Sequence, residues 1–318
     1  MQLVVSLAVF AAGWALAWAS LRVSYALTVL VAIPTAGSLV RLFVLQHDCG
    51  HGSFFASRKA NEVVGFALGV LTMTPFQCWR RYHYVHHASS SNLDRRGFGD
   101  VRMLTVREYM ELTPFRQWVY RLYRSPFVLF GVGPFLLFVL RQRLTYYIPK
   151  DWKVERLSVH VTNAAILACV LGMILLVKPA PFFAVHVPVM AFAASMGVWL
   201  FYVQHQFEDT YWRRRTDWDF VAAGMRGSSH YDLPPVLRWF TADIGIHHIH
   251  HLDCRIPNYR LRECLEANPE LAKVPRLTLR ASLACASLKL WDEDSQRMVR
   301  AYALAHEVYS LQQGEKGL

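Results

Sequence analysis

Eight histidines fall in three short clusters, and their spacing could bring their rings together around metal ions. Two clusters have the pattern H-x-x-H-H, in HYVHH and HHIHH, and the third has H-x-x-x-H, in HDCGH. Residues three and four positions apart share one face of a helix, so the imidazoles of each cluster would point the same way. The eight residues are His47, His51, His83, His86, His87, His247, His250 and His251.

Imidazole is a common ligand for iron, zinc and copper. Because one zinc takes about four protein ligands, eight histidines exceed the needs of one metal and suit two. We therefore predict a dinuclear metal site. Nitrogen-rich ligation without thiolates favours iron that handles oxygen. A zinc hydrolase is the competing interpretation, since ligand type alone does not identify the metal.

Other polar residues could complete or support this site. His205, in QHQFED at the end of an apolar run, is a candidate ninth ligand. A metal-bound histidine usually donates its second N–H to a carboxylate or carbonyl, and Asp48, Glu208 and Asp243 are the candidate acceptors. His248 does not share the face of the other histidines in its cluster, so we expect it to be structural.

The elements that must position these residues are long apolar helices. The chain of 318 residues is 54% hydrophobic and 18% charged, below the usual quarter or so of charged residues. Four runs are long enough to cross a bilayer: 1–19, 24–45, 157–177 and 182–203. We read the first as a retained span, because it lacks the basic start and cleavage site of a signal peptide. The sequence thus predicts an all-α integral membrane protein, one unit over 1–318.

The remaining residues, 46–156 and 204–318, form a predicted cytosolic helical cap that holds the dimetal site. Within it, 61–75 and 126–140 are apolar but short and contain glycine, so we expect interfacial helices. The turns near Arg22 and Lys178 carry one positive charge each, whereas arginines crowd the segments after the second and fourth spans. The positive-inside rule then places both termini and all three clusters on the cytoplasmic side, at the inner membrane if the chain is bacterial. The net charge of +11 is explained by this basic side, and no nucleic-acid-binding motif is present.

Four stretches carry a specific resemblance: HDCGHGSFF, HYVHH, QHQFEDTYW and FTADIGIHHIHHLDCRIPNYRL. They resemble the motifs of membrane fatty-acid desaturases, most closely the bacterial acyl-lipid delta-12 type, over about 41–268. The resemblance implies transmembrane helices under a cytosolic cap and a di-iron centre held by the eight histidines. It also implies a reaction in which O₂ and two electrons remove two hydrogens from an acyl chain. Arg102 stands where an aromatic residue would be expected, which leaves the substrate open.

An acyl lipid in the membrane is therefore the expected substrate, and O₂ the expected co-substrate. Since the chain has no haem- or flavin-binding segment, we expect a separate electron donor such as a ferredoxin. Two alternatives remain. A hydroxylase, ketolase or acetylenase acting on a lipid or carotenoid would use the same histidines. A metal transporter would place ionisable residues inside its spans, and apart from Arg41 near the end of the second span these runs hold no Asp, Glu, Lys or Arg.

Overall fold

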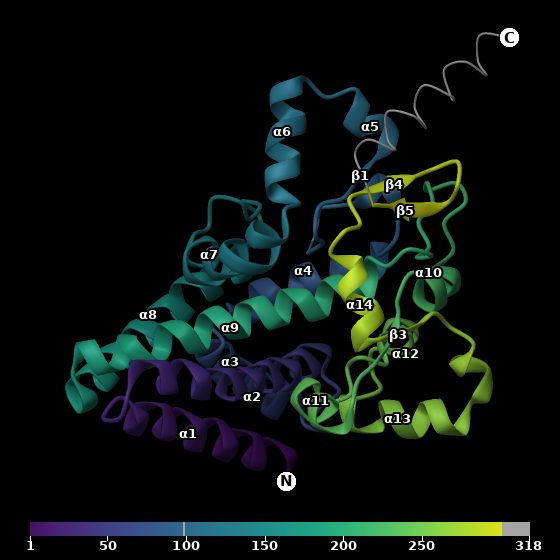
Figure 1. Cartoon of the computed structure of the whole chain (residues 1–318). Helices are drawn as coiled ribbons and strands as arrows, with labels where there is room; N and C mark the ends of the chain where they lie inside the picture. Colours follow the sequence, from purple (N-terminus) through teal and green to yellow (C-terminus); the bar gives the residue numbers. More distant parts are fainter. Residues whose placement is uncertain (98, 301–318) are drawn as a thin grey trace, which may run out of the picture.

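The computed structural model describes residues 1–97 and 99–300, so the predicted cap residues 301–318 lie outside the described part. Four of its helices are long and apolar enough to cross a membrane, and they correspond to the four predicted spans. They lie lengthwise beside one another, and the strands and the helices of the last third of the chain lie toward one end of them (Figure 1). The helical membrane fold predicted from the sequence is confirmed. The four helices are α1 (Gln2–Ser20), α2 (Tyr25–His51), α8 (Lys153–Val177) and α9 (Pro179–His205).

Two of these helices continue past the predicted ends of their spans. The second span was predicted to stop at Leu45, but α2 runs on to His51 and is capped by Gly52, whose φ is +72°. The fourth was predicted to stop at 203, but α9 includes His205 in its last turn. The side chains become more polar after 45 and 203, where the predicted spans end, but the helical backbone hydrogen bonds of α2 and α9 continue. As a result, the predicted ligands of both segments stand on regular helix and not on loops.

Short helices surround the long ones, and two of them fall in the predicted interfacial segments. The segment 61–75 is covered by a helix that ends at Leu71 and a turn that follows it. The segment 126–140 begins with a π-helical turn and continues as a short α-helix, bent by 55° from the helix before it. The elements of this region are α3 (Arg58–Leu71), α4 (Phe76–Ser89), α5 (Val106–Met110), α6 (Pro114–Tyr123), η2 (Val128–Val132) and α7 (Gly133–Val139).

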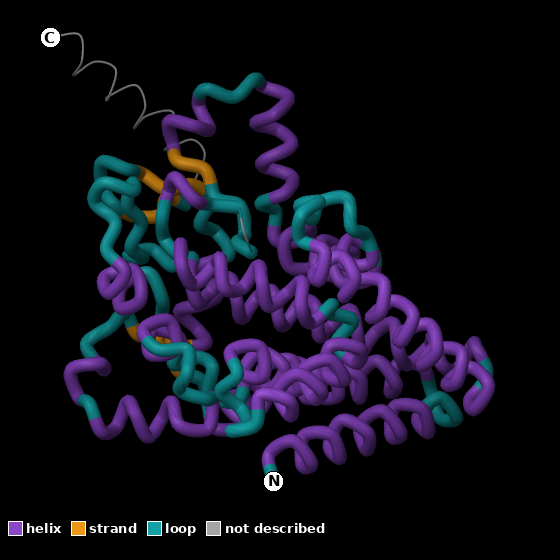
Figure 2. Tube along the Cα trace, turned by 180° about the vertical axis from the view of Figure 1, so that it is seen from behind, coloured by secondary structure: helices purple, strands orange, loops and turns teal. Residues whose placement is uncertain are grey.

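Two small sheets, which the all-α prediction did not include, join distant parts of the cap. In one, β1 (Leu104–Thr105) pairs in parallel with β4 (Leu290–Asp292), which pairs antiparallel with β5 (Arg297–Val299). In the other, β2 (His230–Asp232) pairs in parallel with β3 (Arg276–Thr278). Strands this short have too few alternating positions to stand out in a sequence. Figure 2 shows them at the cap end of the molecule. The other cap helices are α10 (Phe220–Arg226), α11 (Pro235–Thr241), α12 (His247–Leu252), α13 (Asn258–Ala267) and α14 (Leu279–Cys285).

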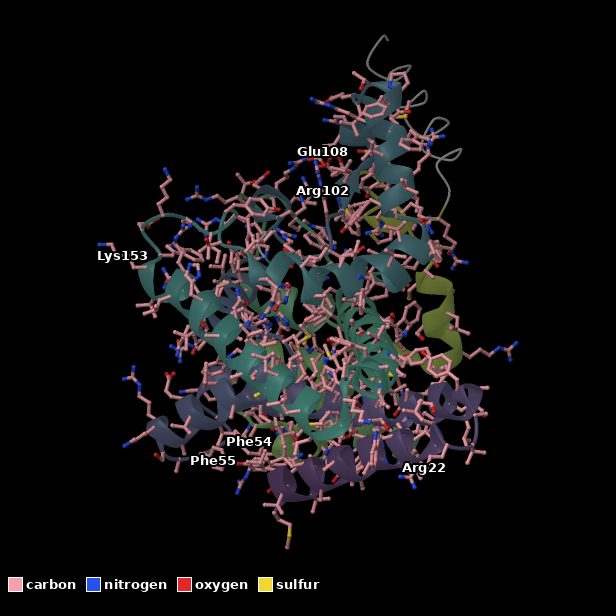
Figure 3. The ribbon with its side chains drawn as sticks, turned by 90° about the vertical axis from the view of Figure 1, so that its left-hand side faces the viewer. Arg22, Phe54, Phe55, Arg102, Glu108 and Lys153 are labelled. Carbon is pink, nitrogen blue, oxygen red and sulfur yellow. The ribbon has the colours of Figure 1, made fainter. Side chains whose placement is uncertain are left out.

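The beginning of α1 lies against the cap. Gln2 Nε2 donates a hydrogen bond to Asn258 Oδ1 at 2.7 Å. The buried Arg41 of α2 donates from Nε to Ser6 Oγ at 2.8 Å, and its guanidinium lies 4.5 Å from the ring centroid of Trp239. Arg41 thus joins two spans to the cap. Arg22, in the turn between α1 and α2, lies at the other end of these helices (Figures 1 and 3).

Candidate metal centre

All nine predicted ligands lie in one continuous cluster of imidazole rings, formed by four helices. His47 and His51 come from the end of α2, and His205 from the end of α9. The α4 and α12 helices supply three rings each. Eight of the nine form two compact groups, within each of which one nitrogen per ring lies within 4.8 Å of the others. The first group is His47, His51, His83, His87 and His250, and the second is His86, His205 and His251.

The first group centres on His87. Its Nε2 lies 3.1 Å from Nε2 of His83 and 3.0 Å from Nε2 of His250. The two rings from α2 complete the group, with the centroid of His47 4.4 Å from that of His250 and the centroid of His51 4.8 Å from that of His87. This group draws on three helices that are far apart in the sequence.

The second group centres on His205. Its Nε2 lies 3.2 Å from Nε2 of His86 and 3.0 Å from Nε2 of His247. The ring of His251 lies 4.7 Å from that of His205. His247 therefore reaches this group through His205, although the two compact groups do not include it.

Each helix with the H-x-x-H-H spacing contributes rings to both groups. In α4, His83 and His87 belong to the first group and His86 to the second. In α12, His250 belongs to the first and His251 to the second. The sequence predicted that these rings share one helix face. The structure adds that adjacent rings on this face belong to different groups. One short helix can thus serve two metal ions side by side.

The donor set fits two metal ions. Two nitrogens each about 2.1 Å from one ion and at right angles to each other would be about 3.0 Å apart, close to the Nε2–Nε2 distances found here. Several buried ring nitrogens of the cluster also have no hydrogen-bond partner among the described residues, namely His47 Nε2, His51 Nδ1 and Nε2, and His251 Nε2. Since an unpaired buried polar atom is costly, so many of them in one place indicate a bound cation.

Burial keeps these rings ready to bind metal. It lowers the pKa of His83, His87 and His250 well below the usual value, and the neighbouring imidazoles lower it further. Burial and the adjacent rings have the same effect on the pKa of His247 and His251. A neutral imidazole has the lone pair that a metal requires, so few protons must leave when an ion binds.

Two carboxylates accept hydrogen bonds from the Nδ1 atoms of rings in the cluster. Asp48 Oδ1 accepts a hydrogen bond from His47 Nδ1 at 3.0 Å, and its Oδ2 accepts from the backbone N and from Nδ2 of Asn258, each at 2.7 Å. Asp100 Oδ1 accepts from His86 Nδ1 at 2.6 Å. In both rings the bonded Nδ1 directs Nε2 toward the cluster, which is the usual support for a metal-bound histidine.

The other two predicted carboxylates are engaged elsewhere. Glu208 forms an ion pair with Arg300, and Asp243 forms one with Arg262 at 2.7 Å. Among the described residues, neither carboxylate is hydrogen-bonded to a histidine of the cluster. Glu208 lies just beyond the end of α9, where the chain has already turned toward β5, with Met298 N donating to its backbone oxygen. The expected roles of Glu208 and Asp243 therefore have no support in their contacts.

Asp100 is the functional candidate that sequence reasoning missed. It ends the glycine-rich segment RRGFGD, and no fixed spacing connects it to a histidine. Gly99, at a φ of +74°, turns the chain back against α4 next to His86. Gly99 and Gly97, whose φ is +102°, are the sequence signals that could have marked this return. His248, by contrast, is buried away from the cluster beside His230, as predicted.

An apolar cavity of about 720 Å³ leads to the histidines. His47 and His83 of the first group line it, and so does His247, whose Nε2 lies 3.0 Å from that of His205 in the second group. Aromatic and aliphatic side chains line much of the rest, from α2, α4, α7 and α9, among them Phe43, Trp79, Leu137, Phe138, Met190 and Phe201. The ring of Trp79 stacks on His83 at 4.6 Å, which joins the cavity wall to the cluster. This shape suits a long apolar chain.

Comparison with known proteins agrees with this geometry. A family model described as fatty acid desaturase matches residues 21–281. A protein of Bacillus subtilis named fatty acid desaturase is 43% identical over 298 residues, which cover 94% of this chain and 84% of the relative. The sn-1 oleoyl-lipid 12-desaturase of Synechocystis is 27% identical over 72% of this chain and 64% of its own length. A sunflower relative, named as a chloroplastic sn-2 acyl-lipid omega-3 desaturase (ferredoxin), is 28% identical over 74% of this chain and 54% of its own length.

The buried histidines, the apolar cavity beside them and these matches lead to one conclusion: the chain belongs to the fatty acid desaturase family, a family of oxidoreductases.

Proposed function

We propose that the chain is a single membrane-embedded unit that introduces a double bond into a lipid-linked acyl chain, using O₂ and two histidine-bound iron ions. The observation that carries this proposal is that the apolar cavity is lined by His47 and His83 of the first group and by His247, the neighbour of His205 in the second. In the balanced reaction, one –CH₂–CH₂– unit, O₂, two electrons and two protons give –CH=CH– and two waters. When bound, the two irons would supply the O₂-dependent oxidation that removes the two hydrogens.

The residues of this chain place the substrate and exclude water. We assign the nine histidines as ligands: five for one ion, and His86, His205, His247 and His251 for the other. Asp48 and Asp100 hold the rings of His47 and His86 in place. Phe43 and Trp79, whose ring centroids are 5.5 Å apart, form a rigid wall of the cavity next to His83. Such a wall fixes which methylenes of the acyl chain lie beside the cluster and keeps water away from it.

We propose that the histidine clusters and the N-terminus face the cytoplasm. Arg41 and Gln2 tie the spans to the cap, so the N-terminus and the cluster lie at the same end of the bundle. The predicted basic side of the membrane is also this end, whereas Arg22 lies at the other. The C-terminus lies outside the described residues, and its cytoplasmic position remains a prediction.

Electrons would come from a ferredoxin-like protein that docks on the cap. Tyr84 is the candidate entry point, because its side chain is 44% exposed and its ring lies 5.7 Å from that of His51. Burial raises the pKa of Tyr84, the nearby Arg80 and Arg58 oppose that rise, and Glu62, which pairs with Arg80, adds to it. The net charge of +11 would steer an acidic donor toward the protein. Added salt should therefore slow electron delivery by a ferredoxin but not by a small uncharged reductant.

The deciding experiment is expression in a host whose lipids contain only saturated and monounsaturated chains, followed by mass spectrometry of the lipids. Loss of two hydrogens at a defined position is the expected result, and His250→Ala should abolish it. Gain of an oxygen atom would instead identify a hydroxylase or ketolase built on the same cluster. Unchanged lipids, with iron bound and reduced donor present, would reject the proposal.

A further inference from the structure

The helix α6 carries a stripe of large apolar side chains on its outer face. Phe115, Trp118, Val119 and Leu122 are 70%, 58%, 44% and 47% exposed, and their spacing places them on one side of the helix. The rings of Phe115 and Trp118 stack with centroids 6.1 Å apart. The helix lies in a segment whose many arginines led to its prediction as part of a polar cap. We therefore expect this stripe to contact an apolar partner outside the chain.

The opposite face of α6 is fixed to the cap, so the stripe cannot turn inward. Tyr120 is buried, and its hydroxyl donates to the backbone oxygen of Lys289 at 2.8 Å and accepts from the backbone N of Leu104 at 3.1 Å. Gln117 Nε2 donates to the backbone oxygen of Tyr109 at 3.2 Å. These bonds attach α6 to α5 and to the sheet of β1 and β4. Because these bonds hold the opposite face of α6 against the cap, the stripe points away from the cap.

We propose that α6 lies on the membrane surface with this stripe in the lipid. Arg116 and Arg121 flank the stripe on either side, the arrangement of a helix that lies in the interface of an anionic bilayer. Figures 1 and 2 show α6 crosswise to α1, α2 and α9 and projecting beyond them, as a helix parallel to the membrane plane must be.

The apolar surface next to α6 favours lipid over a second copy of the chain. After α6, Phe127, Leu136 and Leu140 are 75%, 43% and 56% exposed, so exposed apolar side chains continue from the stripe through η2 and α7. The α7 helix packs beside α9, one of the four helices long enough to cross a membrane. The stripe is thus one edge of the surface that the bilayer covers.

The position of α6 gives the contact a role in substrate access, an argument that depends on the proposed function. Tyr123 at the end of α6, and Val128 and Leu129 of η2, line the apolar cavity. Leu136 and Leu140, which are 43% and 56% exposed, line it too, so this wall of the cavity adjoins the exposed apolar surface. An α6 held in the interface would keep this wall at the depth where acyl chains of the bilayer begin, and lipid would enter the cavity here.

Spin labels test the membrane contact. Single cysteines would replace Trp118 or Leu122, and Arg116 as the control on the same helix, in a background with Cys169, Cys254 and Cys264 changed to serine. In anionic nanodiscs, we expect labels at 118 and 122 to collide with O₂ at least fivefold more than with a water-soluble nickel chelate, and the label at 116 to show the reverse. Equal nickel access at all three positions would overturn the proposal. So would dipolar coupling between labels at 118, which would place a second copy on the stripe.

The role in substrate access has its own test. Phe115→Glu with Trp118→Glu should lower the desaturation rate at least tenfold with unchanged metal content, while Phe115→Leu with Trp118→Phe should keep it within twofold. Val221→Glu, at a 57% exposed position on α10, is the matched control and should also stay within twofold. An unchanged rate in the double glutamate variant would reject the access role. If the wild type itself desaturates nothing, the proposed function fails, but the spin-label result still decides where α6 lies.

Discussion

Asp100 accepts a hydrogen bond from Nδ1 of His86 at 2.6 Å, across a turn that no histidine motif contains. This bond fixes the ring so that its Nε2 meets that of His205. We expect Asp100→Asn to weaken metal binding by about 10–100-fold, the usual effect of losing such a partner. Metal content after competition with a chelator measures this. Asp243→Asn, whose carboxylate pairs with Arg262 and is hydrogen-bonded to no histidine of the cluster among the described residues, is the control, and equal losses in both variants would contradict the role of Asp100.

His205 should be required for one metal ion and not for both. Its ring is central to the second group and does not belong to the first. Purified His205→Ala should therefore hold about half of the wild-type metal by elemental analysis, while His160→Ala, at an exposed position on α8, should hold all of it. Full metal content in His205→Ala would remove this residue from the ligand set.

Arg124 should stabilise the junction between the cap and α9. It is 1% exposed, and its guanidinium donates to Gln206 Oε1 at 2.7 Å, to the hydroxyl of Tyr202 at 3.0 Å and to the backbone oxygen of Leu288 at 2.8 Å. Arg124→Leu leaves these buried acceptors without their donor, which costs on the order of 3 kcal/mol of unfolding free energy. A lower thermal unfolding midpoint in detergent is expected, against no change for Arg95→Ala at an exposed site.

Lys289 should make stability depend on alkaline pH. Burial and the charge of Arg124 lower its pKa from 10.5 to about 8, while Nζ donates to the backbone oxygens of Arg124 and Ala286. Between these two values the unfolded chain binds more protons than the folded one, so stability rises with pH in that window. The unfolding midpoint of the wild type, relative to Lys289→Met, should therefore increase from about pH 7.5 to about pH 9.5. A constant difference between the two proteins would contradict this sign.

Gly50 should control the placement of Trp79. A Cβ at this position would lie 2.8 Å from Cζ3 of that ring, which stacks on His83 and lines the cavity. We expect Gly50→Ala to displace the ring and lower the rate of desaturation several-fold with metal still bound. Gly172→Ala, where nothing lies within 4 Å of the added carbon, should leave the rate unchanged.

The sequence by itself determined the nine histidines of the cluster, the four long helices and the family. The histidines and the helices depend on local periodicity and hydropathy, which a sequence shows directly: rings three and four residues apart share a helix face, and apolar runs of sufficient length form spans. The family depends instead on the resemblance of the histidine motifs to those of known desaturases. The same locality explains why Asp48, beside His47, was found as a hydrogen-bond partner.

Only the tertiary structure decided how these parts divide and what supports them. The assignment of His86 and His83 to different groups depends on where α9 and α2 approach α4, which no local pattern contains. Asp100 reaches its histidine through a glycine turn, and Glu208 is drawn away by its ion pair with Arg300. The outward stripe of α6 is apolar like any buried face, and only the packing of Tyr120 on the cap shows that its other side must meet something outside the chain.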